Sequence, residues 1–451
     1  MTTTKEPCDS LIEARWCIPV EPADQVHERC AIAIRDGVIL NVLPISEAQQ
    51  RYAPGAVLSR PNHVLIPGLV NTHTHAAMTL LRGYAEDLPL ERWLREGVWP
   101  AERRWVSAEM VRDGTRHAVC EMLKSGTTCF SDQYFYPEVV AAVADEAELR
   151  AVVATPVIDV ETTWAAGGAE CLRIAADRVH DPYADHPLIS TAFAPHTTRE
   201  VSDETFQSMR VMADQLDCPV QIHLHESASE IDGAIAQTGE RPLARLARLG
   251  FVNASLLAVH CVHLLDDEVE MLADAGVGVA HCPRSNLKLA SGMARVADLS
   301  AAGVIVGLGT DGAASNNELD LLGELRTAAL LAKGVAGDAA AMPAADTLRM
   351  ATLDGARVLG LAERTGSLIP GKQADIACLD MGRINSQPLY DAVSQVVYTG
   401  RADQVTDVWV GGRHLLDAGR TTTIDEDEVL ERSKEWRRRI AAGRATKEAN
   451  Q

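Results

Sequence analysis

The stretch "VLIPGLVNTHTHAAMTLLRG", residues 64–83, joins an apolar run broken by Pro and Gly to two histidines, His73 and His75. Residues i and i+2 of a β-strand point to the same face, so both imidazoles lie side by side at the end of a predicted buried strand. Such a pair occurs as ordinary hydrogen-bonded side chains and also in metal sites, and it is weaker evidence than a four-ligand spacing pattern. The other strands therefore have to decide between these two interpretations.

Eight short β-rich runs alternate with helix-patterned segments over residues 64–365. This alternation predicts a (β/α)8 barrel of the TIM type. A doubly wound open sheet is the competing arrangement, but it would usually need a Gly-rich phosphate-binding turn after the first strand, and the sequence has none there. In order, the runs are "VLIPGLVNTH", "TTCFSD", "RAVVATPVID", "PLISTAFAPH", "PVQIHLHE", "SLLAVHCV", "GVGVAHCP" and "GVIVGLGTD".

The two flanks of this region have a different pattern. Residues 1–63 and 366–420 contain short strands joined by Gly turns, which predicts one small composite β-sandwich built from both chain ends. The remaining segment, 421–451, reads as a charged amphipathic helix that is solvated on the surface and frays at its end. The predicted domains are thus the barrel at 64–365, the two halves of the sandwich and this tail.

Composition limits the possible partners. The chain has 451 residues, 47% of them hydrophobic and 23% charged, which is typical of a globular protein with a large core. The formal net charge of −21 argues against a nucleic-acid polymer as partner and leaves small neutral or cationic substrates open.

The cysteines and the apolar segments indicate a compartment. Ten cysteines are scattered without a C-x-x-C pair, as expected of reduced, buried thiols. The first 20 residues lack the apolar core of a signal peptide, and no uncharged apolar stretch reaches the length of a membrane span. We therefore expect a soluble cytoplasmic protein with no membrane partner.

Polar side chains end six of the eight predicted strands. In a barrel of this type the active site gathers at the carboxyl ends of the strands, so these side chains should converge on one rim. Ordinary packing does not explain six such ends, and the convergence favours a metal site. The residues are His73, His75, His196, His223, His225, Glu226, His260, His281 and Asp311.

Imidazole and carboxylate together suit a divalent ion such as zinc, with one position left open for water. His73, His75 and Asp311 are the firmest candidates for ligands. His223 and His225 share one face of the fifth strand, so spacing cannot choose between them. The fourth strand ends without a lysine that could bridge two metals as a carbamate, which favours a single ion.

Five ordered motifs carry a resemblance to a known family. The chain resembles the amidohydrolase superfamily over about residues 60–415, and within it the 5-methylthioadenosine/S-adenosylhomocysteine deaminases and their chlorohydrolase-like relatives. The resemblance implies a barrel with a composite β-sandwich and one zinc-type ion, held by His73, His75, His223 and Asp311, with His225 as a variable neighbour. The motifs are "LIPGLVNTHTHAAMTLLRG", "IHLHES", "HCPRSNLKL", "GLGTDGAASNN" and "GSLIPGKQADI".

The resemblance also implies roles for the other residues. Glu226 matches the acid/base glutamate, and His260 matches a histidine beside the hydrolytic water. Glu102 and His196 match substrate-binding positions, with Glu102 accepting hydrogen bonds from the two ribose hydroxyls. Trp93 packs either on the same part of the ligand or in the core. For His281, a supporting role and a purely structural hydrogen bond are equally open.

These roles together imply hydrolytic deamination of an adenosine-type nucleoside with release of ammonia. Asp311 would take a proton from water, and Glu226 would protonate the ring nitrogen next to the attacked carbon. The alternatives are an enzyme acting on another amino- or chloro-substituted heterocycle, such as guanine, cytosine or an s-triazine, and a scaffold protein that has lost its metal. Every ligand position is filled, which disfavours the scaffold. A homo-oligomer is expected from the family alone.

The arginine content after the third predicted strand bears on which 5′ substituent the substrate carries. Some family members carry arginines in and after the third strand that could hold a carboxylate, but this chain has no arginine between Arg150 and Arg173. The charged tail of S-adenosylhomocysteine would gain little there, whereas methylthioadenosine carries only a small thioether. We therefore expect methylthioadenosine to be the preferred substrate, with adenosine and S-adenosylhomocysteine behind it.

Overall fold

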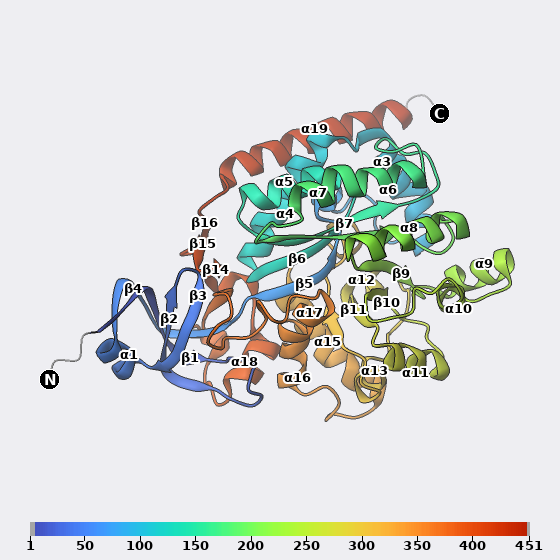
Figure 1. The fold of residues 1–451 in the computed structure, drawn as a ribbon. Helices are drawn as coiled ribbons and strands as arrows, with labels where there is room; N and C mark the ends of the chain where they lie inside the picture. Colours follow the sequence, from blue (N-terminus) through green and yellow to red (C-terminus); the bar gives the residue numbers. More distant parts are fainter. Residues whose placement is uncertain (1–4, 449–451) are drawn as a thin grey trace. The chain divides into compact units, whose positions relative to one another are not determined.

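The computed structural model describes residues 5–448, which fall into two compact units (Figure 1). One unit contains the described residues up to Asn71, with 122–129 and 320–422. The other contains 72–121, 130–319 and the described residues from Thr423 onward. The domain boundaries inferred from the sequence stay predictions.

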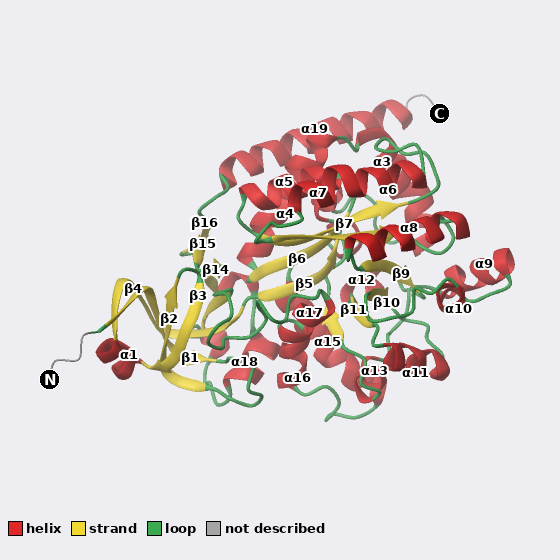
Figure 2. Ribbon diagram, in the orientation of Figure 1, coloured by secondary structure: helices red, strands yellow, loops and turns green. Residues whose placement is uncertain are grey.

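Eight strands form a sheet in which neighbours follow sequence order, and the strands from β7 to β12 pair in parallel. The strand residues are almost entirely buried, as in a parallel barrel whose outer face is covered by helices and whose interior is filled by side chains. Helices alternate with the strands around the sheet (Figure 2). The predicted (β/α)8 barrel is confirmed. Its strands are β5 (Leu69–Thr74), β6 (Thr127–Gln133), β7 (Arg150–Val157), β8 (Ile189–Pro195), β9 (Val220–Leu224), β10 (Leu256–His260), β11 (Gly278–His281) and β12 (Val306–Leu308).

The first and last barrel strands meet at their carboxyl ends. The backbone N–H of Asp311, three residues past β12, donates to the carbonyl oxygen of His73 at 3.0 Å. A Cβ on Gly309 would lie 2.9 Å from the backbone nitrogen of His73, so only glycine permits this approach. The ring of strands therefore closes beside the first histidine of the motif.

The second sheet has the order β16-β15-β14-β13-β4-β1-β2-β3. Its N-terminal and C-terminal strands meet where β4 pairs antiparallel with β13, with Leu65 opposite Cys378. Ile12, Ile32 and Trp409 belong to its core. Strands from both chain ends thus form one β-domain, as predicted. The strands are β1 (Glu6–Cys17), β2 (His27–Arg35), β3 (Val38–Pro44), β4 (Tyr52–Pro67), β13 (Ile376–Asp380), β14 (Val405–Val410), β15 (Arg413–Asp417) and β16 (Arg420–Thr421).

The segment after β5 builds one wall of the site. It begins with a short 3-10 helix, η1 (Ala76–Leu81). A longer helical segment follows, made of α2 (Leu90–Arg92), the π-helix η2 (Trp93–Val98) and α3 (Trp99–Trp105). The helix α4 (Ala108–Lys124) then supports η1 from behind, since Thr79 Oγ1 donates to the carbonyl oxygen of Gly114 at 2.7 Å.

The C-terminal helix α19 (Glu426–Glu448) differs from the prediction of a solvated tail. Trp436 is only 2% exposed, and its indole nitrogen donates to Asp113 of α4 at 2.8 Å. Arg432 also binds Asp113, at 2.7 Å, and Glu109 at 2.6 Å. The charge-rich sequence hid these partners because they lie more than 300 residues earlier; residues 449–451 lie outside the described part.

In the described part of the chain, no helix combines the length and apolar character needed to cross a bilayer. All ten cysteines are buried and free of disulfides.

Candidate active site

Four side chains converge at the carboxyl ends of β5, β9 and β12, and we call them the metal-facing cluster: His73, His75, His223 and Asp311. The Nε2 atoms of His73 and His223 are 3.2 Å apart. Asp311 Oδ1 lies 3.2 Å from His75 Nε2 and 3.6 Å from His73 Nε2. Three imidazole nitrogens and a carboxylate aimed at one point are the donor set that suits zinc.

The outer nitrogens of two of these rings are held by backbone carbonyls. His75 Nδ1 lies 2.5 Å from the carbonyl oxygen of Gln133, and His223 Nδ1 lies 2.8 Å from that of His196. A ring that donates from Nδ1 presents its Nε2 lone pair to the cluster. Burial lowers the pKa of His73 to about 4 and that of His223 well below its usual value, so both rings are neutral near pH 7.

Asp311 is held equally firmly. Its Oδ2 accepts hydrogen bonds from the hydroxyls of Ser285 at 2.6 Å and Ser315 at 2.8 Å, while Oδ1 accepts from the backbone N–H of Gly312 at 2.8 Å. Burial alone would raise the pKa of this carboxyl, but the bonds to His73 and His75 outweigh it and the pKa lies well below its usual value. Asp311 is therefore a carboxylate with a fixed orientation.

The structure separates the two histidines that spacing could not. β9 ends at Leu224, and His225 follows with a left-handed backbone (φ 53°). Its ring is fully buried away from the metal-facing cluster, with Nδ1 3.4 Å from Glu268 Oε2 and Nε2 accepting from the N–H of Leu243 at 3.3 Å. His223 alone of the pair joins His73; its role as a ligand stays a prediction.

Glu226 and His260 lie next to the cluster. His260 Nε2 is 3.8 Å from Glu226 Oε2, and its ring stacks on that of His223 with centroids 5.5 Å apart. The side-chain amide of Asn286 lies 3.0 Å from His260 Nδ1, which leaves Nε2 facing the site. Burial raises the pKa of Glu226, as the role of a general acid requires.

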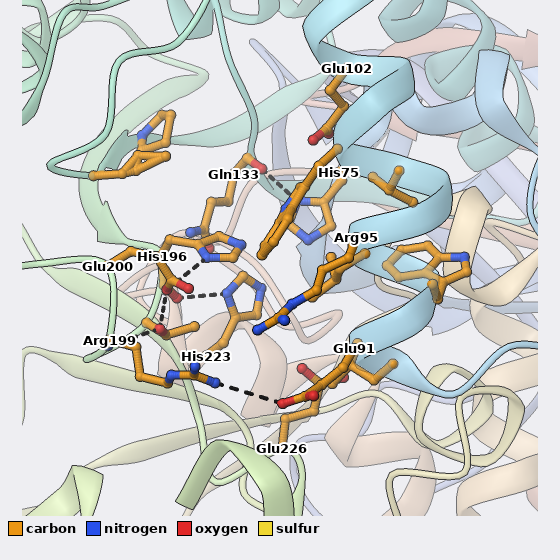
Figure 3. Close-up of a pocket in the computed structure, with 18 of the residues that line it drawn as sticks. His75, Glu91, Arg95, Glu102, Gln133, His196, Arg199, Glu200, His223 and Glu226 are labelled. Atoms are coloured by element: carbon orange, nitrogen blue, oxygen red, sulfur yellow. Dashed lines mark hydrogen bonds and ion pairs between the residues drawn. The ribbon is translucent and has the colours of Figure 1, made fainter. Parts of the chain in front are cut away.

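The predicted substrate residues line the same pocket. Glu102 in α3 is buried and accepts a hydrogen bond from the hydroxyl of Tyr134 at 2.9 Å, and burial raises its pKa. His196 Nδ1 pairs with Glu200 at 3.3 Å. Trp93 is 5% exposed, and its indole nitrogen has no hydrogen-bond partner within residues 5–448. Figure 3 shows the labelled residues converging from several elements.

His281 ends β11 but does not line the pocket. It is buried, and burial lowers its pKa to about 3. It is therefore a neutral core histidine near pH 7.

Sequence reasoning missed several partners. Ser285, Asn286 and Ser315 stand inside the quoted motifs "HCPRSNLKL" and "GLGTDGAASNN", so the motifs contained the signal although the residues were not singled out. Tyr134 directly follows β6, the second barrel strand, and the rule that site residues gather at strand ends could have found it. Gln133 binds His75 through its backbone carbonyl oxygen, and the sequence does not reveal such a contact because every residue has this group.

Known proteins are similar to this chain over nearly its whole length. The profile of the Amidohydrolase family matches residues 64–415. A protein of Teredinibacter turnerae named 5-methylthioadenosine/S-adenosylhomocysteine deaminase is 44% identical over 439 residues, covering 97% of this chain and 98% of that protein. A protein of Saccharophagus degradans with the same name is 42% identical, covering 98% and 99%.

Solved structures extend the likeness. The crystal structure of an adenosine deaminase from Xanthomonas campestris with bound zinc has a TM-score of 0.96 and 49% identity, covering 97% of this chain and all of that one. Atrazine chlorohydrolase from Arthrobacter aurescens, complexed with zinc, has a TM-score of 0.88 at 23% identity, covering 95% and 99%, and shares the fold. On the family match and these full-length relatives, the chain belongs to the amidohydrolase family.

Proposed function

We propose that the protein is a metal-dependent hydrolytic deaminase of adenosine-type nucleosides that releases ammonia. The observation that carries this proposal is one pocket lined by His75, His223 and Asp311 of the metal-facing cluster, together with half-buried Glu226 and buried Glu102. The names of the similar proteins, methylthioadenosine/S-adenosylhomocysteine deaminase and adenosine deaminase, support the same reaction.

The donor set of the metal-facing cluster fits one zinc ion. His73, His75, His223 and Asp311 would hold it, and the zinc bound in the 49% identical relative supports that choice. Such an ion lowers the pKa of bound water from near 16 to about 7 and so makes a nucleophile available at neutral pH.

The chain's own residues would handle the protons. Asp311, ionised and fixed by two hydroxyls, can accept a proton from the water. His260, oriented by Asn286, would hold the water in line through Nε2. Glu226, whose pKa is raised by burial, would give a proton to the ring nitrogen beside the attacked carbon. The proton taken up by Asp311 would pass to the amino group, which then leaves as ammonia.

The ribose would be recognised by Glu102. Its carboxyl is buried and has Tyr134 as one partner, so it can accept further hydrogen bonds from two vicinal hydroxyls. Nucleosides that lack these hydroxyls would leave a buried acceptor unpaired, which costs about 1–3 kcal/mol. Trp93 lies on the same helical segment as Glu102 and also lines the pocket, and it would pack on the ligand.

Methylthioadenosine would be the preferred substrate, ahead of adenosine and S-adenosylhomocysteine. Residues 151–172 contain no arginine, and the pocket lining from this segment consists of apolar Pro156, Ile158 and Val160 with Glu161, Thr162 and Thr163. A wall with apolar side chains, one carboxylate and no cation favours a small thioether over a tail that carries a carboxylate.

An ammonia-release panel tests this proposal. It contains methylthioadenosine, S-adenosylhomocysteine, adenosine and 2′,3′-dideoxyadenosine, with guanine, cytosine and a chlorotriazine as other heterocycles. We expect kcat/KM to be highest for methylthioadenosine and lowered for the dideoxy compound. Turnover of a non-purine alone would refute the nucleoside assignment.

We also infer that the protein acts in the cytoplasm, because all ten thiols are buried and unpaired, as is usual in a reducing compartment. Its partners would be the nucleoside and water, and its net charge of −21 disfavours nucleic-acid polymers and acidic surfaces. Self-association stays an expectation, which light scattering coupled to size exclusion would test.

A further inference from the structure

Several charged side chains line the pocket and take no part in the proposed reaction, and three of them lie on two facing elements. We call Glu91, Arg95 and Arg199 the mouth cluster. Glu91 and Arg95 are exposed, whereas His73, His223 and Asp311 of the metal-facing cluster are buried. Figure 3 shows Arg95 and Arg199 reaching into the pocket from two different elements, with Glu91 beside Arg199.

The position of each group follows from its local structure. Glu91 and Arg95 stand four residues apart on the helical segment formed by α2, η2 and α3, so they lie on neighbouring turns of one face. Arg199 belongs to the loop after β8, and its guanidinium packs close to Gly233, where an added Cβ would lie 3.1 Å from Cζ. The mouth cluster is therefore placed by separate elements before any ligand arrives.

The contact between these groups is easily exchanged. Glu91 Oε1 lies 3.9 Å from Arg199 Nη1, with side chains 47% and 33% exposed. An exposed pair at this distance stabilises the fold by at most about 1 kcal/mol. Within residues 5–448, Arg95 has no hydrogen-bond or ion-pair partner. Its guanidinium donors are available to a ligand.

Two guanidinium groups and one carboxylate are complementary to an α-amino acid. Guanidinium binds carboxylate by charge-assisted, often bidentate hydrogen bonds, and a carboxylate such as Glu91 accepts from an ammonium group. Among the proposed substrates, only S-adenosylhomocysteine ends in this zwitterion. Methylthioadenosine and adenosine offer the mouth cluster no charge.

The spacing along the helical segment suits such a ligand. Arg95 precedes Glu102 by seven residues, which is about 10 Å along a helix axis. A nucleoside whose ribose is held at Glu102 therefore has the mouth cluster within the same pocket. A long 5′ substituent such as the homocysteine tail can reach charged groups of this pocket that a short substituent does not contact.

We propose that the mouth cluster is a subsite for the α-amino acid tail of S-adenosylhomocysteine, with Arg95 and Arg199 binding the carboxylate and Glu91 binding the ammonium group. The inference rests on the proposed function. Arg95 and Arg199 would supply the positive charge that the loop after β7 lacks. Because Arg199 must leave Glu91 to bind the tail, S-adenosylhomocysteine would bind less favourably than its charge alone suggests, as expected of a lesser substrate.

The test compares kcat/KM for S-adenosylhomocysteine with that for methylthioadenosine in Arg95→Gln, Arg199→Gln and Glu91→Gln. The ratio should fall at least about tenfold in each arginine variant, as expected for a lost charge-assisted bond. Arg92→Gln is the matched control, because Arg92 lies on the same helical segment, pairs with Glu96 and does not line the pocket. Its ratio should stay within about twofold of the wild type.

Two truncated ligands assign the partners. The fall in Arg95→Gln should disappear for an S-adenosyl thioether whose tail keeps the ammonium but lacks the carboxylate. The fall in Glu91→Gln should disappear for a tail that keeps the carboxylate but lacks the ammonium. Calorimetric Kd values for S-adenosylhomocysteine should follow the same pattern without relying on turnover.

An unchanged ratio in Arg95→Gln, or an equal fall in Arg92→Gln, would overturn the subsite. If the wild type does not deaminate S-adenosylhomocysteine, its inhibition of methylthioadenosine turnover replaces the ratio, and absence of both binding and inhibition also overturns it. A wild type that deaminates methylthioadenosine but fails these tests refutes the subsite alone. A wild type inactive on every adenosine-type nucleoside refutes the proposed function, and the subsite with it.

Discussion

The two ends of the pocket are built in opposite ways. In the metal-facing cluster, His75, His223 and Asp311 are each held by backbone or hydroxyl partners at hydrogen-bond distance. In the mouth cluster, Glu91 and Arg199 form a long, exposed pair at 3.9 Å, and Arg95 has no ion-pair partner within residues 5–448. Chemistry needs fixed groups because small displacements cost rate, whereas a specificity group can be exposed and replaceable. Substitutions should therefore have large effects at one end and small effects at the other.

The largest expected effect separates the two histidines of β9. His223→Ala should reduce turnover to background and strip the metal, because a four-ligand site loses its geometry. His225→Ala should keep the metal but lower the melting temperature, since its removal leaves buried groups without partners, a cost of about 1–3 kcal/mol. Mass-spectrometric metal content and thermal unfolding measure both. Metal loss in His225→Ala with retention in His223→Ala would reverse the assignment.

Glu226→Gln should remove the proton donor of the reaction without changing the metal content of the site. Glutamine keeps the size of the side chain but cannot deliver a proton, so turnover should drop by at least about 10²-fold. Zinc content should stay at the wild-type level. Glu270→Gln, on an exposed position of the helix after β10, is the control and should remain fully active. Near-normal turnover in Glu226→Gln would remove this carboxyl from the mechanism.

Ser285→Ala tests whether support behind the metal-facing cluster matters. The hydroxyl lies 2.6 Å from Asp311 Oδ2, and loss of such an outer partner typically lowers metal affinity or activity about 10- to 100-fold. Competition with a calibrated zinc chelator measures the affinity. Ser208→Ala, at an exposed position on α8 (Asp203–Leu216), should behave as wild type. An equally unchanged Ser285→Ala would mean that Ser315 and the backbone of Gly312 suffice to hold Asp311.

The smallest expected effect is on stability at the mouth. Glu91→Gln should change the free energy of unfolding by less than about 1 kcal/mol, because the pair with Arg199 is exposed and long. Glu268→Gln provides the contrast, since Glu268 is buried and pairs with Arg241 at 2.7 Å and with His225. Urea unfolding of both variants gives the comparison. A loss at Glu91 as large as that at Glu268 would show that the mouth is as firmly built as the interior.

The sequence predicted the barrel, and also that polar side chains gather at its rim, because both follow from the order of strands and helices along the chain. Polar residues at the ends of parallel strands must share an edge, which placed His73, His75 and Asp311 together before any coordinates. The choice between His223 and His225 was out of reach, since a period of two puts both on one face. It depended on β9 ending at Leu224, and strand boundaries are poorly read from sequence.

Contacts between residues far apart in the sequence could not be predicted either. Tyr134 binds Glu102 across 32 positions, and Asp113 binds Trp436 across 323. No local sequence pattern indicates such pairs. The mouth cluster was missed for another reason. The sequence has no arginine after the third strand, but arginines from other elements can also line the pocket. Here they come from η2 and from the loop after β8.

The packing of α19 on α4 has a consequence for synthesis of the chain. Trp436 and Arg432 fasten α4 through Asp113, and the next residue, Gly114, supports Thr79 of the helix that directly follows His75. A ribosome makes the histidines and α4 before it makes α19. A chain released before residue 426 would therefore contain every metal-facing residue and still lack the contacts of Trp436 and Arg432 that hold α4 at Asp113.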